Sequence, residues 1–263
     1  MDRSFRTGPF RSARSSARER SAVSDGSDEA GSARSRRTAR RRPGPVALLL
    51  WGAAAAFGAG PSSAQLSAPE HWRWRTDEPA RLVVDQEVGA DAWRFVGMPP
   101  GWHLTTGPAA LLWDPAIEGR GRFVVETRMI LFPEPSEAGY GVFVGGRDLD
   151  GEVPRYTAFL IRRDGSAAVV TRGREATDTL VRWTRHEAIR PHGGSGTVEN
   201  VLGVAADAAT VIFTVNGDTV ASLPRERVDP SGRLGFRIGE SLNMHITTLD
   251  VTYRLAPARE GGG

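Results

Sequence analysis

Residues 210–223 read TVIFTVNGDTVASL, and this stretch predicts a β-hairpin. Apolar and polar side chains alternate on both sides of Asn216-Gly217, and a period of two is typical of strands. Asn-Gly is the dipeptide that best tolerates the two positive φ angles of a type I′ turn. We therefore expect two antiparallel strands joined at residues 216 and 217, and we assign this hairpin to the scaffold and not to a binding site.

Short alternating or apolar runs recur along the chain after Gln65, with Gly, Pro and Asp between them. A second hairpin is expected in 155–172, where the two residues Asp164 and Gly165 form the turn. Helical periodicity is almost absent, and the patch 224–229 is too short to matter. Further strands are expected within 121–132, 138–146, 199–207, 232–239 and 243–255. So many short strands in one domain predict an all-β fold of two packed antiparallel sheets.

The order of these motifs resembles that of a known superfamily. From Asn200 to Val251 the chain carries a strand, the Asn-Gly hairpin, the strand GRLGFR and a final amphipathic strand, in the order of the C-terminal half of a concanavalin A-like jelly roll. From Trp93 to Leu255, through PPGWHLTTGPAALLWDP, GYGVFVGG, YTAFLIRRDG and LNMHI, the chain is similar to exported bacterial proteins near the laminin-G-like and 3-keto-disaccharide-hydrolase-like branches. The resemblance implies a two-sheet jelly-roll sandwich over residues 93–256, whose function must be argued from its site.

The N-terminal part has the organisation of an export signal. Residues 1–42 are rich in Arg and Ser and are expected to be disordered. Residues 43–64 contain an apolar run and end in small residues, with cleavage expected after Ala64. The apolar run of about 14 residues is short for a membrane span, which needs roughly 20. We therefore expect a secreted or periplasmic protein without a membrane span after signal removal; an uncleaved anchor is the alternative.

Charge is divided unevenly between this leader and the rest of the chain. All 34 basic residues are Arg; residues 1–64 hold 12 of them and five acidic residues, which gives +7. Residues 65–263 hold the other 22 Arg and 26 acidic residues, which gives −4, and the two parts sum to +3. A mildly acidic part without a basic aromatic cluster is not expected to bind nucleic acid. Residues 65–92 are expected to lead into the sandwich and residues 257–263 to form a flexible tail.

The chain has no recognisable catalytic motif. Hydrolases of the resembled fold commonly carry Glu-x-Asp-x-Glu on one strand, whereas this chain has Glu126 and, at the same parity, Arg128. Glu126 is a weak catalytic candidate, because we expect it to form an ion pair with Arg128. There is no Cys and no Gly-x-Ser-x-Gly elbow, and the five His lack metal-ligand spacing. The absence of Cys also argues against a lipoprotein.

One acidic loop is a weak candidate for a metal site. The stretch GGRDLDGEVPR places Asp148, Asp150 and Glu152 at alternating positions around Gly151. Oxygen-rich loops of this kind bind Ca²⁺, although this one lacks a ligand position of the EF-hand pattern. An exposed acidic turn is the alternative, and no other cofactor is expected.

Aromatic and polar side chains supply the candidates for ligand binding. Sugar rings present flat C–H faces that stack on exposed aromatic rings, while most large aromatic side chains belong to cores, as we expect for Trp93 and Trp113. We also expect Arg237, Asn243 and His245 to converge on one surface. The full candidate set is Trp102, His103, Glu126, Arg128, Tyr140, Tyr156, Arg162, Trp183, Arg237, Asn243 and His245, with Trp102-His103, Tyr140, Tyr156 and Trp183 as exposed platforms.

These features favour a secreted module that binds a glycan or glycoconjugate. One alternative is a divergent glycoside hydrolase-like enzyme that uses Glu126 or an acidic loop residue. The other is a laminin-G-like domain that binds an extracellular protein, which a large exposed apolar patch would favour. A cleft with two carboxylates at working separation would favour the hydrolase. The sequence carries no signal for an oligomeric state.

Overall fold

The computed structural model describes residues 69–83, 88–247 and 249–254, which form two β-sheets and one short helix. The expected N-terminal region and signal peptide (1–64) and the expected tail (257–263) lie outside the described residues. Among the described residues, no helix has the length and apolar character needed to cross a membrane.

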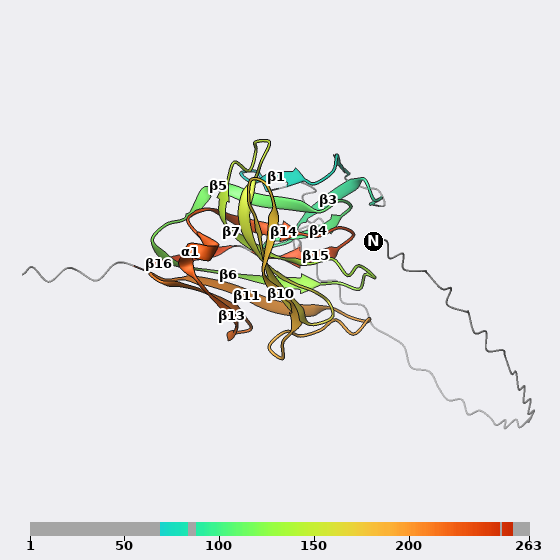
Figure 1. Cartoon of the computed structure of the whole chain (residues 1–263). Helices are drawn as coiled ribbons and strands as arrows, with labels where there is room; N and C mark the ends of the chain where they lie inside the picture. The colour runs from blue at the N-terminus through green and yellow to red at the C-terminus, as the bar shows by residue number, and fades with distance from the viewer. Residues whose placement is uncertain (1–68, 84–87, 248, 255–263) are drawn as a thin grey trace, which may run out of the picture. The chain divides into compact units, whose positions relative to one another are not determined.

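The strands form two sheets; β1 and β5 of the first lie side by side at the top of Figure 1, and β6, β11 and β13 of the second lie below them. The first sheet contains, in spatial order, β1 (Arg73–Thr76), β5 (Ala110–Gly119), β14 (Gly232–Ile238), β7 (Tyr140–Arg147), β8 (Arg155–Ile161), β9 (Ser166–Arg172) and β10 (Thr177–Arg185). The second contains β13 (Asp218–Pro224), β12 (Thr210–Val215), β11 (Val198–Ala206), β6 (Arg122–Leu131), β15 (Asn243–Ile246), β4 (Trp102–Thr106), β3 (Ala92–Gly97) and β2 (Arg81–Leu82), while β16 (Asp250–Arg254) also pairs with β6. Helix α1 (Arg225–Val228) is the only helix in the described part.

This architecture confirms the all-β sandwich of two antiparallel-rich sheets. It also differs from the expected strands in four places, the first of which is β3, β4 and β5, where no strand range was expected. Strands β1 and β2 come from the segment expected as a lead-in, and both join a sheet. Strand β10 was not expected, and the single strand expected in 243–255 is divided into β15 and β16, which pair with different parts of β6.

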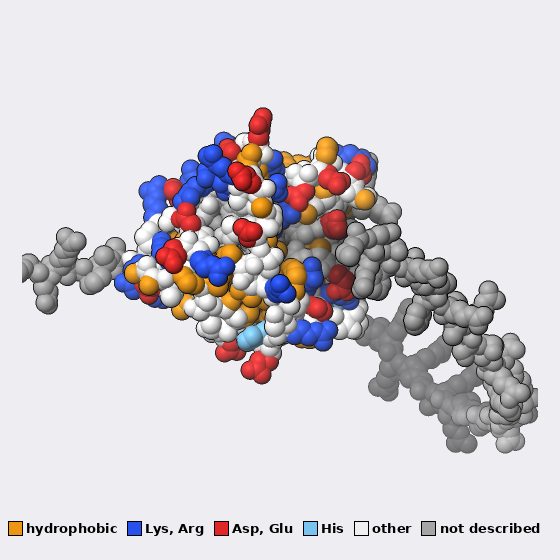
Figure 2. Space-filling model, viewed as in Figure 1, with side chains coloured by type: hydrophobic (Ala, Val, Ile, Leu, Met, Phe, Trp, Pro, Cys, Tyr) orange, Lys and Arg blue, Asp and Glu red, His pale blue; other side chains and the backbone are white. Residues whose placement is uncertain are grey.

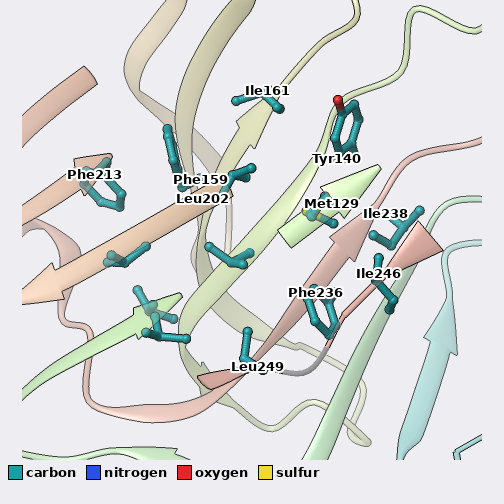
Figure 3. Packing of buried hydrophobic residues seen from close by; sticks show 14 of the residues in the cluster. Met129, Tyr140, Phe159, Ile161, Leu202, Phe213, Phe236, Ile238, Ile246 and Leu249 are labelled. Atoms are coloured by element: carbon teal, nitrogen blue, oxygen red, sulfur yellow. The ribbon is translucent and has the colours of Figure 1, made fainter. Parts of the chain in front are cut away.

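The main core lies between the two sheets and is built from the inward-facing residues of most strands. Phe159 on β8 and Phe213 on β12 face each other across it with ring centroids 5.2 Å apart. Leu202 on β11 lies beside Phe159 (Figure 3). Trp93 and Trp113 are 1% and 2% exposed, so the expectation that both are buried is confirmed.

Both expected hairpins form, but only one has the expected turn. Asn216 and Gly217 have φ angles of 52° and 92°, as a type I′ turn between β12 and β13 requires. Between β8 and β9, Arg162 N–H donates to Ser166 O at 2.9 Å, so the loop contains three residues and not two. Gly165 ends it at φ 83°, the left-handed position of a type I turn with a bulge.

The turn at Gly217 gives a first testable expectation. Gly217→Ala should lower the free energy of unfolding by about 1–2 kcal/mol, because an L-residue pays about this cost at a left-handed backbone position. Gly193→Ala is the matched control: neither glycine has an atom that its new Cβ would crowd, and Gly193 has no positive φ. Urea denaturation of both variants checks this, and equal effects at the two positions would contradict it.

Candidate functional site

The structure places the predicted site residues on opposite sides of the sandwich. The outer face of the second sheet carries His103, Glu126, Arg128, Asn243 and His245, as the registers of β4, β6 and β15 require. The outer face of the first sheet carries Tyr156, Arg162 and Arg237 together with Trp183. The expected convergence of Arg237 with Asn243 and His245 is therefore wrong, because β14 and β15 belong to different sheets.

Neither tyrosine is an exposed platform, so that expectation is also wrong. Tyr140 points into the main core and is 1% exposed, and this burial raises the pKa of its phenol. Tyr156 points outward but is only 8% exposed, because it packs with Phe143 at a centroid distance of 5.5 Å. Leu149, from the loop after β7, belongs to the same second apolar cluster.

The two tryptophan candidates differ in how much of each ring is free. Trp102 is half-buried, packs against the main core and lies 5.6 Å from the ring of Trp72, so it is not an exposed platform either. Trp183 is half-buried on the edge strand β10, and the Arg162 guanidinium lies 3.7 Å from its ring centroid. This cation–π contact uses one face of the Trp183 ring.

Arginine side chains gather on the face drawn in Figure 2, at the upper left over β5. Three arginines, Arg73, Arg147 and Arg233, line a hollow of about 390 Å³. They pair with Asp150 at 2.8 Å, Asp229 at 2.6 Å and Glu118 at 3.4 Å, respectively. Because each guanidinium already has a carboxylate partner, the hollow offers little net attraction for an anion.

The acidic loop after β7 is organised by arginine. Asp150 pairs with Arg73, and Asp148 adopts a φ of 55° with its carbonyl accepting a hydrogen bond from Gly151 N–H. Within the described ranges, no three His, Asp or Glu side chains are placed to hold a metal ion. Calcium at Asp148, Asp150 and Glu152 therefore stays a prediction.

A groove of about 500 Å³ runs along the outer face of the second sheet, within the size range of small-molecule sites. Ile130 on β6 and Val201 on β11 supply half-buried aliphatic surface. The residues that line it are Pro100, Glu126, Thr127, Arg128, Ile130, Glu199, Val201, His245, Thr247 and Asp250. Three of the residues predicted from the sequence therefore meet in one groove: Glu126, Arg128 and His245.

The charged side chains of the groove do not pair as expected. Arg128 Nη1 donates to Glu199 Oε1 at 2.9 Å, so the expected pair with Glu126 is wrong. In the register of β11 with β6, Glu199 lies opposite Ile130 and on the same outer face as Arg128. The Arg128 guanidinium therefore pairs with Glu199 on the neighbouring strand and not with Glu126 on its own strand. Glu126 faces Asp250 of β16 in the register. Three carboxylates and one guanidinium thus give the groove a net negative charge.

Beside the groove, polar side chains on three neighbouring strands contain buried atoms without hydrogen-bond partners. Within the described part of the chain these include His103 Nδ1, Thr105 Oγ1, Asn243 Oδ1, His245 Nδ1 and Arg94 Nε. Arg94, Thr105 and Asn243 share one row of the sheet, and His103 and His245 share the next. His245 is 7% exposed and also lines the groove. Each unpaired buried polar atom costs about 1–3 kcal/mol, so this cluster lowers the stability of the sheet.

Burial also shifts the protonation of this cluster. It lowers the pKa of His103 below 6.5; contact with the Asn243 amide opposes the shift, and the charges of His245 and Arg94 add to it. The folded protein therefore keeps His103 neutral at pH values where the unfolded chain takes up a proton. The stabilisation is present above the unfolded pKa and is lost as pH falls toward the folded pKa.

This linkage gives a second testable expectation. The free energy of unfolding should decrease between pH 7 and pH 5, and His103→Gln should make that decrease smaller. Urea denaturation at both pH values measures the difference. His71→Gln is the control, because His71 is exposed. An unchanged pH dependence in His103→Gln would contradict the expectation.

The chain matches no protein-family model and no curated protein, but it is similar in shape to solved structures. One is a GH16 protein of the mixed-linkage glucan PUL of Bacteroides ovatus in complex with a G4G4G3G product: TM-score 0.50, 8% identity, 72% of this chain and 98% of that one covered. Another is an endo-β-1,3-glucanase from Pyrococcus furiosus: TM-score 0.50, 10% identity, 71% and 89% covered. A third is the carbohydrate-binding module CBM66 from Bacillus subtilis: TM-score 0.49, 8% identity, 68% and 95% covered. The first two likenesses show the concanavalin A-like jelly-roll fold.

Sequence reasoning missed Glu199 and Asp250. Glu199 lies at the start of a run that was expected to be a strand, and Asp250 lies within another. Only the pairing of β11 and β16 with β6 brings both carboxylates to Glu126 and Arg128. The signal for Glu199 is its parity along the strand, which is opposite to that of the core residues Leu202 and Val204 and therefore marks an outward position.

Proposed function

We propose that this protein is an exported carbohydrate-binding protein whose ligand lies in the groove between β11, β6 and β16. The observation that carries the proposal is that one groove brings the Arg128–Glu199 pair together with the Glu126 carboxylate, the His245 ring and aliphatic surface. Sugar hydroxyls both donate and accept hydrogen bonds, so a mixed set of guanidinium, carboxylate and imidazole groups suits them.

The groove also suits the apolar part of a sugar and restricts its charge. Ile130 and Val201 offer aliphatic surface to the C–H groups of a pyranose ring. The net negative charge of the groove disfavours uronic acids and sulfated sugars, because like charges repel. The ligand class is therefore a neutral or amino-bearing oligosaccharide.

Export fits this ligand class. Removal of the signal in residues 43–64 would deliver the folded part to the cell exterior or periplasm, where polysaccharides are present. Two proteins of the same fold are named for mixed-linkage glucan and for β-1,3-glucan, which makes soluble β-glucan oligosaccharides the first probes.

The test is a calorimetric binding screen of the full chain with neutral gluco-, xylo- and manno-oligosaccharides and with oligogalacturonate. At least one neutral ligand should bind and oligogalacturonate should not. Val201→Trp, which fills the groove, should remove the binding; Val170→Trp, at a half-buried outward position of the first sheet, should leave it intact. No binding to any neutral oligosaccharide, or equal binding by both variants, would refute the proposal.

Hydrolysis of a glycosidic bond is a second candidate, favoured by the register of Glu126 with Asp250. Residues directly opposite each other on antiparallel strands have Cβ atoms about 4.5–5.5 Å apart. Retaining glycosidases hold two carboxyl groups about 5–5.5 Å apart, and side chains that start from facing Cβ atoms can reach this separation. If the groove is catalytic, Glu126→Gln should lower the release of reducing ends by about 100-fold or more while binding persists. An oligosaccharide that binds in the groove and is not cleaved would exclude this candidate.

A further inference from the structure

Another hollow lies at one end of the first sheet, where the turn after β5, the end of β7 and the start of β14 meet. This end hollow has a volume of about 400 Å³, and its charged lining consists of Arg120, Arg147, Arg233 and Glu118. The strand register explains the assembly, because Arg233 lies opposite Glu118 on β5 and opposite Gly146 on β7. The groove on the second sheet contains none of these residues, so the two surfaces are separate candidate sites.

Positive charge exceeds negative charge in the end hollow. Glu118 Oε2 accepts hydrogen bonds from Arg120 Nη2 at 2.7 Å and from Arg233 Nη1 at 3.4 Å, so one carboxylate serves two guanidiniums. Arg147 pairs with Asp229 at 2.6 Å. Three guanidiniums therefore share two carboxylates. The neighbouring hollow lacks this surplus, because each of its three guanidiniums has a carboxylate of its own.

A fourth guanidinium holds two walls of the end hollow together. Arg225 Nη2, from helix α1, donates to Gly121 O at 2.8 Å and to Ser231 Oγ at 3.3 Å. Arg225 Nη1 donates to Asp207 O at 2.6 Å. These acceptors are two carbonyls and a hydroxyl, so the bonds leave the positive charge of Arg225 in place beside the hollow. Arg147 Nη2 also donates to Ser231 O at 3.2 Å, and walls fixed in this way lose little entropy when a ligand binds.

The three lining arginines still have donors for a ligand. Each guanidinium carries five N–H donors. Among the described residues, protein acceptors occupy one donor of Arg120, two of Arg147 and one of Arg233. A sulfate or phosphate group presents oxygens in tetrahedral directions, so it can accept hydrogen bonds from guanidiniums on three different segments of the chain. A carboxylate has two coplanar oxygens and matches a single guanidinium fork, so it gains less from this arrangement.

We propose that the end hollow binds a tetrahedral oxyanion, a sulfate or phosphate group, through Arg120, Arg147 and Arg233. The proposal is independent of the groove on the second sheet, whose negative charge disfavours such groups. A sulfate ester of a polysaccharide and a free inorganic ion share this chemistry, and titration with both kinds of probe distinguishes the two sources.

The test is calorimetric titration of the full chain at low ionic strength with sodium sulfate, sodium phosphate and a κ-carrageenan hexasaccharide, which carries sulfate esters. At least one probe should bind with saturation, and Arg120→Gln and Arg233→Gln should each weaken its affinity by about tenfold or more. Arg81→Gln is the matched control and should leave the affinity unchanged, because Arg81 is also exposed, pairs with Asp91 at 3.0 Å and lies on the second sheet. Tighter binding of the hexasaccharide assigns the hollow to a sulfated polysaccharide, and tighter binding of an inorganic ion assigns it to the free ion.

Glu118→Gln provides a test with the opposite sign. The Glu118 carboxylate competes with a ligand for Arg120 and Arg233, so its neutralisation should strengthen binding by about threefold or more. Circular dichroism verifies that each variant is folded, and Val201→Trp, which fills the groove, should bind the oxyanion as the original chain does. The proposal is refuted if no probe binds with saturation, if Arg233→Gln and Arg81→Gln have equal affinities, or if folded Glu118→Gln binds no more tightly than the original chain. Loss of binding in Val201→Trp would place the anion in the groove and would refute it as well.

Discussion

Phe159→Ala is expected to lower the free energy of unfolding by about 3–5 kcal/mol, which is the usual cost of removing a buried aromatic ring. Phe159 is 1% exposed and bridges the two sheets through Phe213, at a centroid distance of 5.2 Å. Phe159 and Phe213 lie on strands that are hydrogen-bonded to their neighbours in each sheet. The surrounding side chains can therefore move only partly into the cavity that the substitution leaves. For a domain of this size the melting temperature should fall by about 10 °C or more.

Chemical denaturation and differential scanning calorimetry measure this loss. Met98→Ala is the matched control, because Met98 is 47% exposed and its truncation should change stability by less than about 0.5 kcal/mol. A Phe159 variant as stable as the Met98 variant would mean that the two sheets do not share the core described here.

The main features of this fold could be predicted because they depend on residues that are close together in the sequence. The alternation in 210–223 and the Asn216-Gly217 turn each act within a few residues, and both appear as expected. Strand β10 could not be found in this way. Its side chains are exposed or half-buried throughout, so it has no buried face to produce a clear alternation. The division of 243–255 into β15 and β16 depends on where each pairs along β6, and no local pattern encodes that.

The candidate site was harder to predict than the fold, because exposure depends on distant segments. Tyr156 occupies an outward position on β8, as an exposed platform would, but it is buried in the apolar cluster that contains Phe143 and Leu149. Trp74 occupies an edge strand and stays exposed, although nothing in its own sequence neighbourhood distinguishes it from Trp72. Sequence parity thus gives the direction of a side chain relative to its sheet, and tertiary packing decides what covers it.

Arg128→Glu is expected to weaken oligosaccharide binding in the groove by about 100-fold, or about 2.7 kcal/mol. The variant replaces the one guanidinium among the lining residues by a fourth carboxylate and breaks the contact with Glu199. It removes the hydrogen-bond donors of the guanidinium and leaves acceptors that repel one another. The pair is exposed, with side-chain accessibilities of 54% and 34%, so its loss should lower the free energy of unfolding by less than about 1 kcal/mol. Binding and stability should therefore respond very differently.

The charge swap Arg128→Glu with Glu199→Arg is the decisive companion. It restores one guanidinium and one carboxylate in the groove and should return the affinity to within about tenfold of the original value. A double-mutant cycle from calorimetry, with urea denaturation of each variant, separates the energy of the pair from that of folding. If the swap stays as weak as Arg128→Glu, the ligand requires a donor at position 128 itself. If Arg128→Glu binds as tightly as the original chain, the ion pair takes no part in recognition and the sugar lies elsewhere.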